Sequence, residues 1–252
     1  MTRHSLPDRT DKEVSWHQRR DFLAAAAAWT AAGGFGAAQA QARSNIVELQ
    51  GDALLNGSRL LPQHTIQTGD QIATGPDTTL VFVVGNAAFK VRQNTAMSVE
   101  RGSSINAVSL LRLLAGAVAS VWGRGERRMI VTPTVTAGIR GTGVYTEVSP
   151  QQGGRSYFCN CYGTVDLSAA GDHVTSVADY HQAFWAETEP RNGRMLTPAG
   201  AINHTDDEME TLARLAGQRT AWQIKGHKGM RDGRGYMDDK TGQPHPATMP
   251  RY

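Results

Sequence analysis

Residues 136–167 read TAGIRGTGVYTEVSPQQGGRSYFCNCYGTVDL, and this stretch decides the fold class. Three β-rich runs, residues 144–148, 156–162 and 165–167, are separated by glycine turns, which predicts β-strands. Because side chains alternate between the two faces of a strand, Cys159 and Cys161 are expected on the same face. These are the only two cysteines of the chain. The stretch therefore predicts a β-domain with paired thiols on one face.

The same pattern extends on both sides of this stretch, over residues 45–187. Turn signals recur roughly every 8 to 12 residues, as is typical of all-β domains. Asn56-Gly57 favours a type I′ hairpin turn, and Gly85-Asn86 separates two apolar runs. Residues 109–115 and 117–122 are expected as two β-segments that stop at Gly116. The predicted fold is all-β, a sandwich or short β-roll of many short antiparallel strands.

Composition bounds the class of protein. The 252 residues suit one domain with extensions, and 40% hydrophobic residues suit a packed domain rather than a membrane protein. The 26 Lys and Arg residues against 23 Asp and Glu residues give a net charge of +3. These charges form no basic stripe interleaved with aromatic residues, so we expect no nucleic-acid partner.

The first 42 residues are predicted to be an export signal. Arg19 and Arg20 precede a short apolar run over residues 24–38, as in a twin-arginine signal. Small residues at Ala40 and Ala42 fit two cleavage sites, and the run is short for a membrane span. We expect a periplasmic protein without an integral membrane span after cleavage, folded before export in the reducing cytoplasm. An uncleaved amphipathic helix is the alternative.

The composition changes after residue 187. Residues 188–204 are predicted to be a linker rich in Pro, Gly and Asn. Thr205 and Glu208 form a capping box, which predicts a helix over residues 205–217 whose apolar face docks on the β-domain. Residues 206–208 are acidic and suit the positive end of that helix better than a metal site. Residues 218–252 are predicted to be a flexible tail.

The order of these elements resembles a FecR-type domain over residues 46–168. Four spaced motifs carry the resemblance, at residues 69–75 (GDQIATG), 93–95 (QNT), 113–118 (LLAGAV) and 134–142 (TVTAGIRGT). Such domains are all-β and periplasmic, and in the regulators that name the family they receive a transporter's signal and control a sigma factor. We find no segment matching the cytoplasmic anti-sigma part. The resemblance therefore implies a binding module in cell-envelope signalling or scaffolding, with an envelope protein or a peptidoglycan-associated protein as partner.

The motif residues are expected to serve the fold. Glycines suit turns and bulges where φ is positive or backbones approach closely. Arg140 either forms a salt bridge that fixes its turn or binds an anionic group. The motif residues that we single out are Gly69, Asp70, Thr74, Gly75, Gly138, Arg140, Gly141 and Thr142.

Cys159 and Cys161 allow three interpretations. In a regular strand their Cα atoms lie about 6.5 to 7 Å apart, at the limit for a disulfide, so a bridge would be strained and easily reduced. They could instead be buried thiols that pack as small apolar residues. Third, they could bind copper(I) or zinc, with His181 as the best further ligand and His173 as the next. No other cofactor is expected.

The sequence contains none of the common catalytic motifs, such as a nucleophile elbow, a phosphate loop or a dinucleotide fingerprint. We therefore expect no enzymatic activity. A binding surface is expected at an exposed strand or on the aromatic side near residues 180–185. Several aromatic residues could line a groove there, although most of them are expected in the core: Trp122, Tyr157, Tyr162, Tyr180, Phe184 and Trp185.

Overall fold

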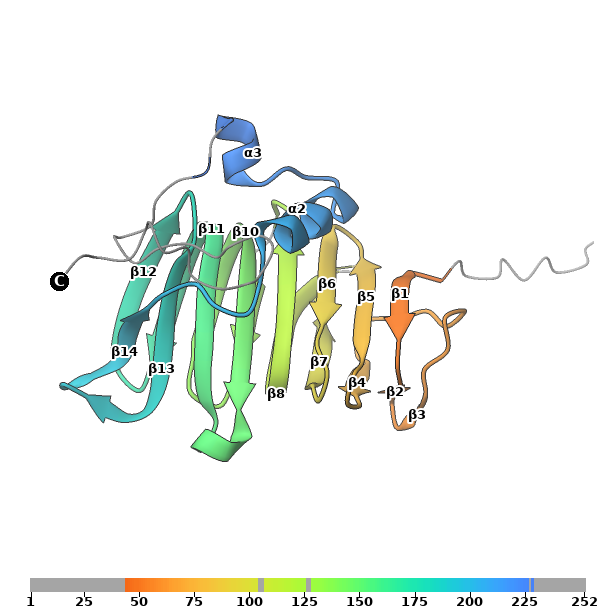
Figure 1. The fold of residues 1–252 in the computed structure, drawn as a ribbon, viewed down its shortest axis with the longest axis horizontal. Coiled ribbons are helices and arrows are strands. Elements are labelled where there is room, and N and C mark those ends of the chain that lie inside the picture. Colours follow the sequence, from red (N-terminus) through yellow and green to blue (C-terminus); the bar gives the residue numbers. More distant parts are fainter. Residues whose placement is uncertain (1–43, 104–106, 126–127, 227, 229–252) are drawn as a thin grey trace, which may run out of the picture. The chain divides into compact units, whose positions relative to one another are not determined.

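The computed structural model describes residues 44–103, 107–125, 128–226 and 228, and most of them are in β-strands. The predicted export signal, with Arg19 and Arg20, lies outside the described residues, as do residues 229–252. Within the described part of the chain, no helix is long and apolar enough to cross a membrane. The expected all-β fold is confirmed (Figure 1).

Fourteen strands form one continuous sheet. They are β1 (Ile46–Gln50), β2 (Ala53–Leu55), β3 (Ser58–Arg59), β4 (Gln71–Thr74), β5 (Thr79–Val84), β6 (Ala87–Val91), β7 (Ala96–Arg101), β8 (Val108–Trp122), β9 (Arg128–Val131), β10 (Thr136–Ser149), β11 (Arg155–Ala169), β12 (Asp172–Ala178), β13 (Gln182–Arg191) and β14 (Arg194–Ala199). The helical elements are the 3-10 helix η1 (Pro150–Gln152) and the α-helices α2 (Asp206–Leu215) and α3 (Ala221–Lys225).

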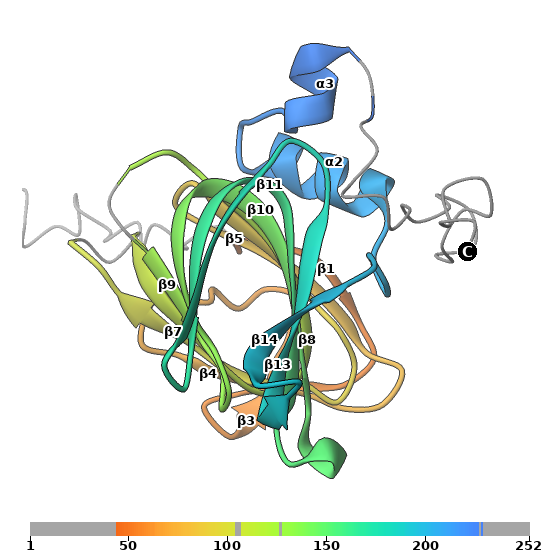
Figure 2. The same ribbon diagram turned by 90° about the vertical axis from the view of Figure 1, so that its left-hand side faces the viewer.

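Three long strands, β8, β10 and β11, carry the sheet from one layer to a second (Figure 2). One layer has the order β1-β5-β6-β8-β10-β11-β13-β14 and uses residues 116–122 of β8. The other has the order β3-β2-β4-β7-β8-β9-β10-β11-β12 and uses residues 108–115 of β8. All pairs are antiparallel except β8 with β9. The sheet thus folds on itself as a sandwich.

Glycines allow these long strands to change layer. Gly116 in β8, Gly141 in β10 and Gly163 in β11 have φ values of 78°, 58° and 101°. A Cβ atom at Gly116 would lie 2.5 Å from the Thr95 Cα atom, so a larger residue does not fit there. Gly116 and Gly141 belong to two of the four motifs that resemble the FecR-type family, at residues 113–118 and 134–142. Their role in this structure is to let the strands change direction.

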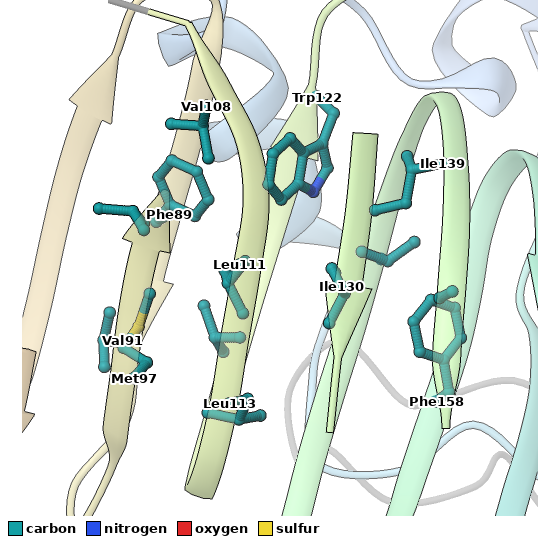
Figure 3. Close-up of a cluster of buried hydrophobic side chains, with 14 of the residues drawn as sticks. Phe89, Val91, Met97, Val108, Leu111, Leu113, Trp122, Ile130, Ile139 and Phe158 are labelled. Carbon is teal, nitrogen blue, oxygen red and sulfur yellow. The ribbon is translucent and has the colours of Figure 1, made fainter. Parts of the chain in front are cut away.

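The main core lies between the two layers. Phe89 and Trp122 contact edge to face with ring centroids 5.2 Å apart, and both are fully buried (Figure 3). Leu111, Leu113 and Ile130 come from the second layer and belong to the same cluster (Figure 3). Burial of such side chains is the main driving force for folding.

A second apolar cluster lies on the outer face of the first layer, under helices α2 and α3. Its helical side chains are Met209, Leu212, Ala213 and Trp222, and α2 contacts β6 and β8. The predicted capping box is present, because Thr205 accepts from the Glu208 N–H and Glu208 accepts from the Thr205 N–H. Helix α2 lies against the sheet, with its apolar side chains in this cluster.

The structure corrects several predicted boundaries. The predicted linker contains the end of β13 and all of β14, because residues 194–199 pair with β13 despite Pro198. The predicted tail contains α3, which has its own capping box at Thr220. Residues 108–122 form one bent strand rather than two segments, because Gly116 bends the strand without ending it. Like β8, strands β10 and β11 are longer than predicted: the three strands have 14 or 15 residues each, where the sequence indicated shorter runs.

Candidate metal centre

Four buried side chains converge near the middle of β11. Cys159 and Cys161 lie on β11, and His181 lies in the turn between β12 and β13. The fourth, His204, comes from the segment between β14 and α2. All four residues are at most 1% exposed. One ligand atom of each lies within 4.8 Å of the other three.

The distances within this cluster are short. The two sulfur atoms are 4.0 Å apart, Cys159 Sγ is 3.6 Å from His181 Nδ1, and Cys161 Sγ is 3.3 Å from His204 Nε2. The two imidazole nitrogens are 3.1 Å apart. For tetrahedral zinc, bond lengths of about 2.3 Å to sulfur and about 2.0–2.1 Å to nitrogen give edges of about 3.8, 3.6 and 3.3 Å for S–S, S–N and N–N pairs. These four edges therefore agree with a Cys2His2 tetrahedron to within about 0.3 Å, and the other two are at most 4.8 Å.

Each histidine has one ring nitrogen facing the cluster and the other facing a hydrogen-bond acceptor. His181 Nε2 lies 2.8 Å from Asp206 Oδ1, and His204 Nδ1 lies 2.7 Å from the Ile202 carbonyl oxygen. Both acceptors favour an N–H on the facing nitrogen, so the nitrogen that faces the cluster is the one that would bind a metal once it is deprotonated. Histidine ligands of metals almost always donate their other N–H to a carboxylate or a carbonyl in this way.

Neighbouring rings fix the orientation of both imidazoles. His204 stacks on Tyr145 with ring centroids 4.7 Å apart, and His181 stacks on Trp222 at 5.4 Å. The backbone N–H of His181 also donates to the backbone carbonyl oxygen of Cys161, at 2.9 Å. These contacts orient the two imidazole rings within the closed domain.

The charges around the cluster favour thiolate. Burial alone would raise the pKa of Cys159, but the hydrogen bond from Cys161, the charge of His204 and the hydrogen bonds with His181 and His204 hold that pKa well below its usual range. Burial lowers the pKa of His181, but Asp206 and Cys159 outweigh burial and raise it to about 9. Burial also raises the pKa of Asp206, and its bonds with His181, Lys228 and Tyr180 bring it down to about 2. Thiolate is the form of cysteine that binds metals.

Cys159, His181 and Asp206 also stand in the order of a nucleophile, a base and an orienting carboxylate. A nucleophile must reach a substrate, whereas Cys159 has no exposed surface. His204 Nε2 also lies closer to His181 Nδ1 than the Cys159 sulfur does. The arrangement therefore suits coordination of an ion better than nucleophilic attack.

The structure brings together the three predicted ligands, Cys159, Cys161 and His181. His173 is exposed on β12 and lies outside the cluster. His204 was not predicted as a ligand, because β14 carries the chain back to the two cysteines and this strand lies in the predicted linker. Both cysteines are free thiols, so the disulfide considered from the sequence is not formed in the structure.

Asp206 combines two roles. It is the first residue of α2, as the predicted helix start required. Its carboxylate is also 1% exposed, lies 2.8 Å from His181 Nε2, and accepts the Tyr180 hydroxyl at 2.8 Å. Lys228 Nζ lies 2.5 Å from its second oxygen. The acidic run is therefore a helix start that also orients a histidine of the cluster.

The remaining predicted residues serve the fold. Arg140 forms a salt bridge with Asp166 at 2.9 Å, which agrees with the structural alternative for this residue. Asp70 accepts the Gln67 N–H and so fixes the turn before β4. The aromatic residues do not form the expected binding side, because five of the six are buried and Trp185, under the Arg155 guanidinium, is half-buried.

Comparison with known proteins gives weak matches. No protein-family model and no curated protein matches this chain. Two crystal structures from Parabacteroides distasonis, each described as a "putative anti-sigma factor", match with a TM-score of 0.43 and identities of 10% and 11%. The matches cover 53% and 59% of this chain and 60% and 75% of those chains. At these values the likeness carries no argument, so the function is argued from the residues of this chain.

Proposed function

We propose that this protein binds one zinc ion at Cys159, Cys161, His181 and His204. The observation that carries the proposal is the convergence of two sulfurs and two imidazole nitrogens, all within 4.8 Å of one another, in a buried site. Tetrahedral sites with two sulfur and two nitrogen ligands are typical of zinc. With four protein ligands and no exposure to solvent, the site resembles structural rather than catalytic zinc sites.

The balance of charge favours zinc over copper(I). Two thiolates and two neutral imidazoles carry a charge of −2, which a zinc ion cancels and a copper(I) ion leaves at −1. An uncompensated charge in a buried site is costly. Asp206 does not alter this balance, because Lys228 pairs with it.

Export as a folded domain would agree with this chemistry. The twin-arginine signal proposed for residues 1–42 carries folded cargo, so zinc would bind in the cytoplasm, where thiols remain reduced. An ion bound before export would then protect Cys159 and Cys161 from oxidation in the periplasm. The proposal thus accounts for paired cysteines without a disulfide in an exported protein.

Metal analysis of the purified full chain tests the proposal. We expect about one zinc ion per chain for the wild type and His173→Ala, and less than about a tenth of that for Cys161→Ser and His204→Ala. His173 is the matched control because it is a histidine outside the cluster. A zinc-free wild-type protein, or equal zinc content in all four proteins, would refute the proposal. One copper ion in place of zinc would refute the charge argument.

We further propose that the zinc-bound domain acts as a binding module in cell-envelope signalling or scaffolding. Support comes from the strand-turning glycines Gly116 and Gly141, which the family-like motifs supply and the fold requires. Crosslinking in cells should capture an envelope protein or a peptidoglycan-associated protein. Replacing Arg19 and Arg20 by lysine should retain the protein in the cytoplasm and abolish that capture. Capture of the same partner by the retained protein would contradict a periplasmic role.

A further inference from the structure

The four ligands come from two parts of the domain. Cys159 and Cys161 lie on β11 and His181 lies in the turn before β13, whereas His204 belongs to the segment that follows β14 and leads into α2. Asp206, which orients His181, is the first residue of that helix. An ion bound to all four ligands would therefore join the C-terminal segment, residues 200–226, to the sheet.

The C-terminal segment covers a sheet face that is built to receive it. The outer face carries small or apolar side chains, among them Val81, Ala88, Ala119 and Val121. At Gly143, a Cβ atom would lie 2.4 Å from the Tyr162 ring and 2.9 Å from the Met209 terminal methyl group, so glycine leaves room for both side chains on this face. Without the segment, this apolar face would be in contact with water.

The helices of the segment depend on docking for their stability. Helix α2 has 10 residues and α3 has 5, and isolated helices shorter than about 12 to 15 residues are marginal in water. Their buried side chains, Met209, Leu212 and Trp222, belong to the cluster on the outer face of the sheet and would lose that burial if the segment left it. Outside the cluster, the Glu208 carboxylate lies 2.7 Å from Lys90 Nζ and 2.7 Å from the Arg92 guanidinium, but these side chains are 16–28% exposed. Exposed and partly exposed ion pairs contribute little.

We propose that zinc acts as a latch that holds the C-terminal segment on the sheet, and that loss of zinc releases residues 200–226 while the sandwich stays folded. This inference rests on the proposed zinc site. The released state would lack His204 as a ligand, so zinc binds the closed state more tightly than the open one. Free zinc at 100 times its Kd would raise the ratio of closed to open molecules by at most about 100-fold, the limit for an open state that binds no zinc.

Hydrogen exchange of the full chain, with and without a zinc chelator, tests the latch. We expect chelation to speed amide exchange in α2 and α3 at least about 30-fold and to leave β5 and β6 within about twofold. The zinc content of each sample is measured in parallel. Faster exchange in β5 and β6 as well would overturn the latch, because zinc would then hold the whole fold.

A variant that keeps every ligand provides the reciprocal test. Leu212→Ala loosens α2, and because coupling between two events is mutual, it should weaken zinc binding at least about 10-fold. Leu113→Ala is the matched control, since Leu113 is equally buried but lies in the main core. Its zinc affinity should stay within about twofold of the wild type. If the wild type binds zinc but chelation leaves exchange in α2 unchanged, or if Leu212→Ala binds zinc as tightly as the wild type, the latch is overturned and the zinc site stands. A wild type that contains no zinc overturns both the latch and the proposed site.

Discussion

Replacing Asp206 by asparagine should weaken zinc binding without removing a ligand. The carboxylate lies 2.8 Å from His181 Nε2, is 1% exposed, and so supports the imidazole through a charge-assisted hydrogen bond in a dry environment. Asparagine keeps the shape and can still accept that hydrogen bond, but it loses the charge. Loss of such a partner typically lowers metal affinity 10- to 100-fold, which is about 1.4 to 2.7 kcal/mol.

The neighbouring residue provides the control for this prediction. Asp207 is exposed and lies in the same first turn of α2, so Asp207→Asn removes the same charge from the helix start. Interaction with the helix dipole accounts for only about 0.3 to 1 kcal/mol. Affinity is measured by competition with a chelator of known Kd at pH 7, and the visible spectrum of the cobalt-substituted protein reports the ligand geometry. Equal weakening in both variants would refute the role of Asp206 in orienting His181.

Three further predictions concern stability and the thiols. Burial raises the pKa of Glu208, but Arg92 and Lys90 outweigh burial and lower it, so its ion pairs stabilise the fold above the ordinary pKa of the carboxyl group and are lost as pH falls through the lowered pKa. Glu208→Gln should therefore lower the free energy of unfolding in urea by about 1 kcal/mol at pH 7 and by almost nothing near pH 2. A loss that does not change with pH would contradict the ion pairs. Gly116→Ala should destabilise by at least about 2 kcal/mol more than Gly57→Ala, because both positions have φ near 80° but only the first brings a Cβ atom against Thr95; equal unfolding midpoints would refute that steric argument. Protein that is purified in its native state and then denatured should have the intact mass of the reduced chain, whereas a mass lower by two hydrogens would support the disulfide. Both thiols should react with iodoacetamide only after the zinc is removed by a chelator, since zinc occupies them.

Local sequence signals predicted the β-domain well because each hairpin is fixed by neighbouring residues. Asn56 and Gly57 have φ values of 52° and 80°, in keeping with the predicted type I′ turn. Thr205 and Glu208 likewise fix the start of α2 through contacts three residues apart. Such features depend on a few adjacent residues, so they can be inferred without knowledge of the tertiary fold.

The layer changes and β14 could not be predicted in the same way. Gly116 has the sequence signature of a strand end, and only the pairing of β8 with different neighbours on each side shows that the strand continues. Pro198 argues against a strand, yet β14 pairs with β13 alone in the sheet order, so its other side needs no hydrogen-bond donor. In both places the tertiary arrangement overrides the local signal.

The metal centre shows the same division between local and distant information. Alternation along β11 placed Cys159 and Cys161 on one face, and the short turn after β12 placed His181 near them, so three ligands could be predicted. His204 lies 43 residues from Cys161 and reaches it only because β14 returns the chain across the sheet. The residues that turn the strands are distinct from those that would bind the ion. Gly116→Ala should therefore impair folding although all four ligands are present. Cys161→Ser should abolish zinc binding while the sandwich still folds. If Cys161→Ser showed no cooperative unfolding transition, the fold and the site would not be separable.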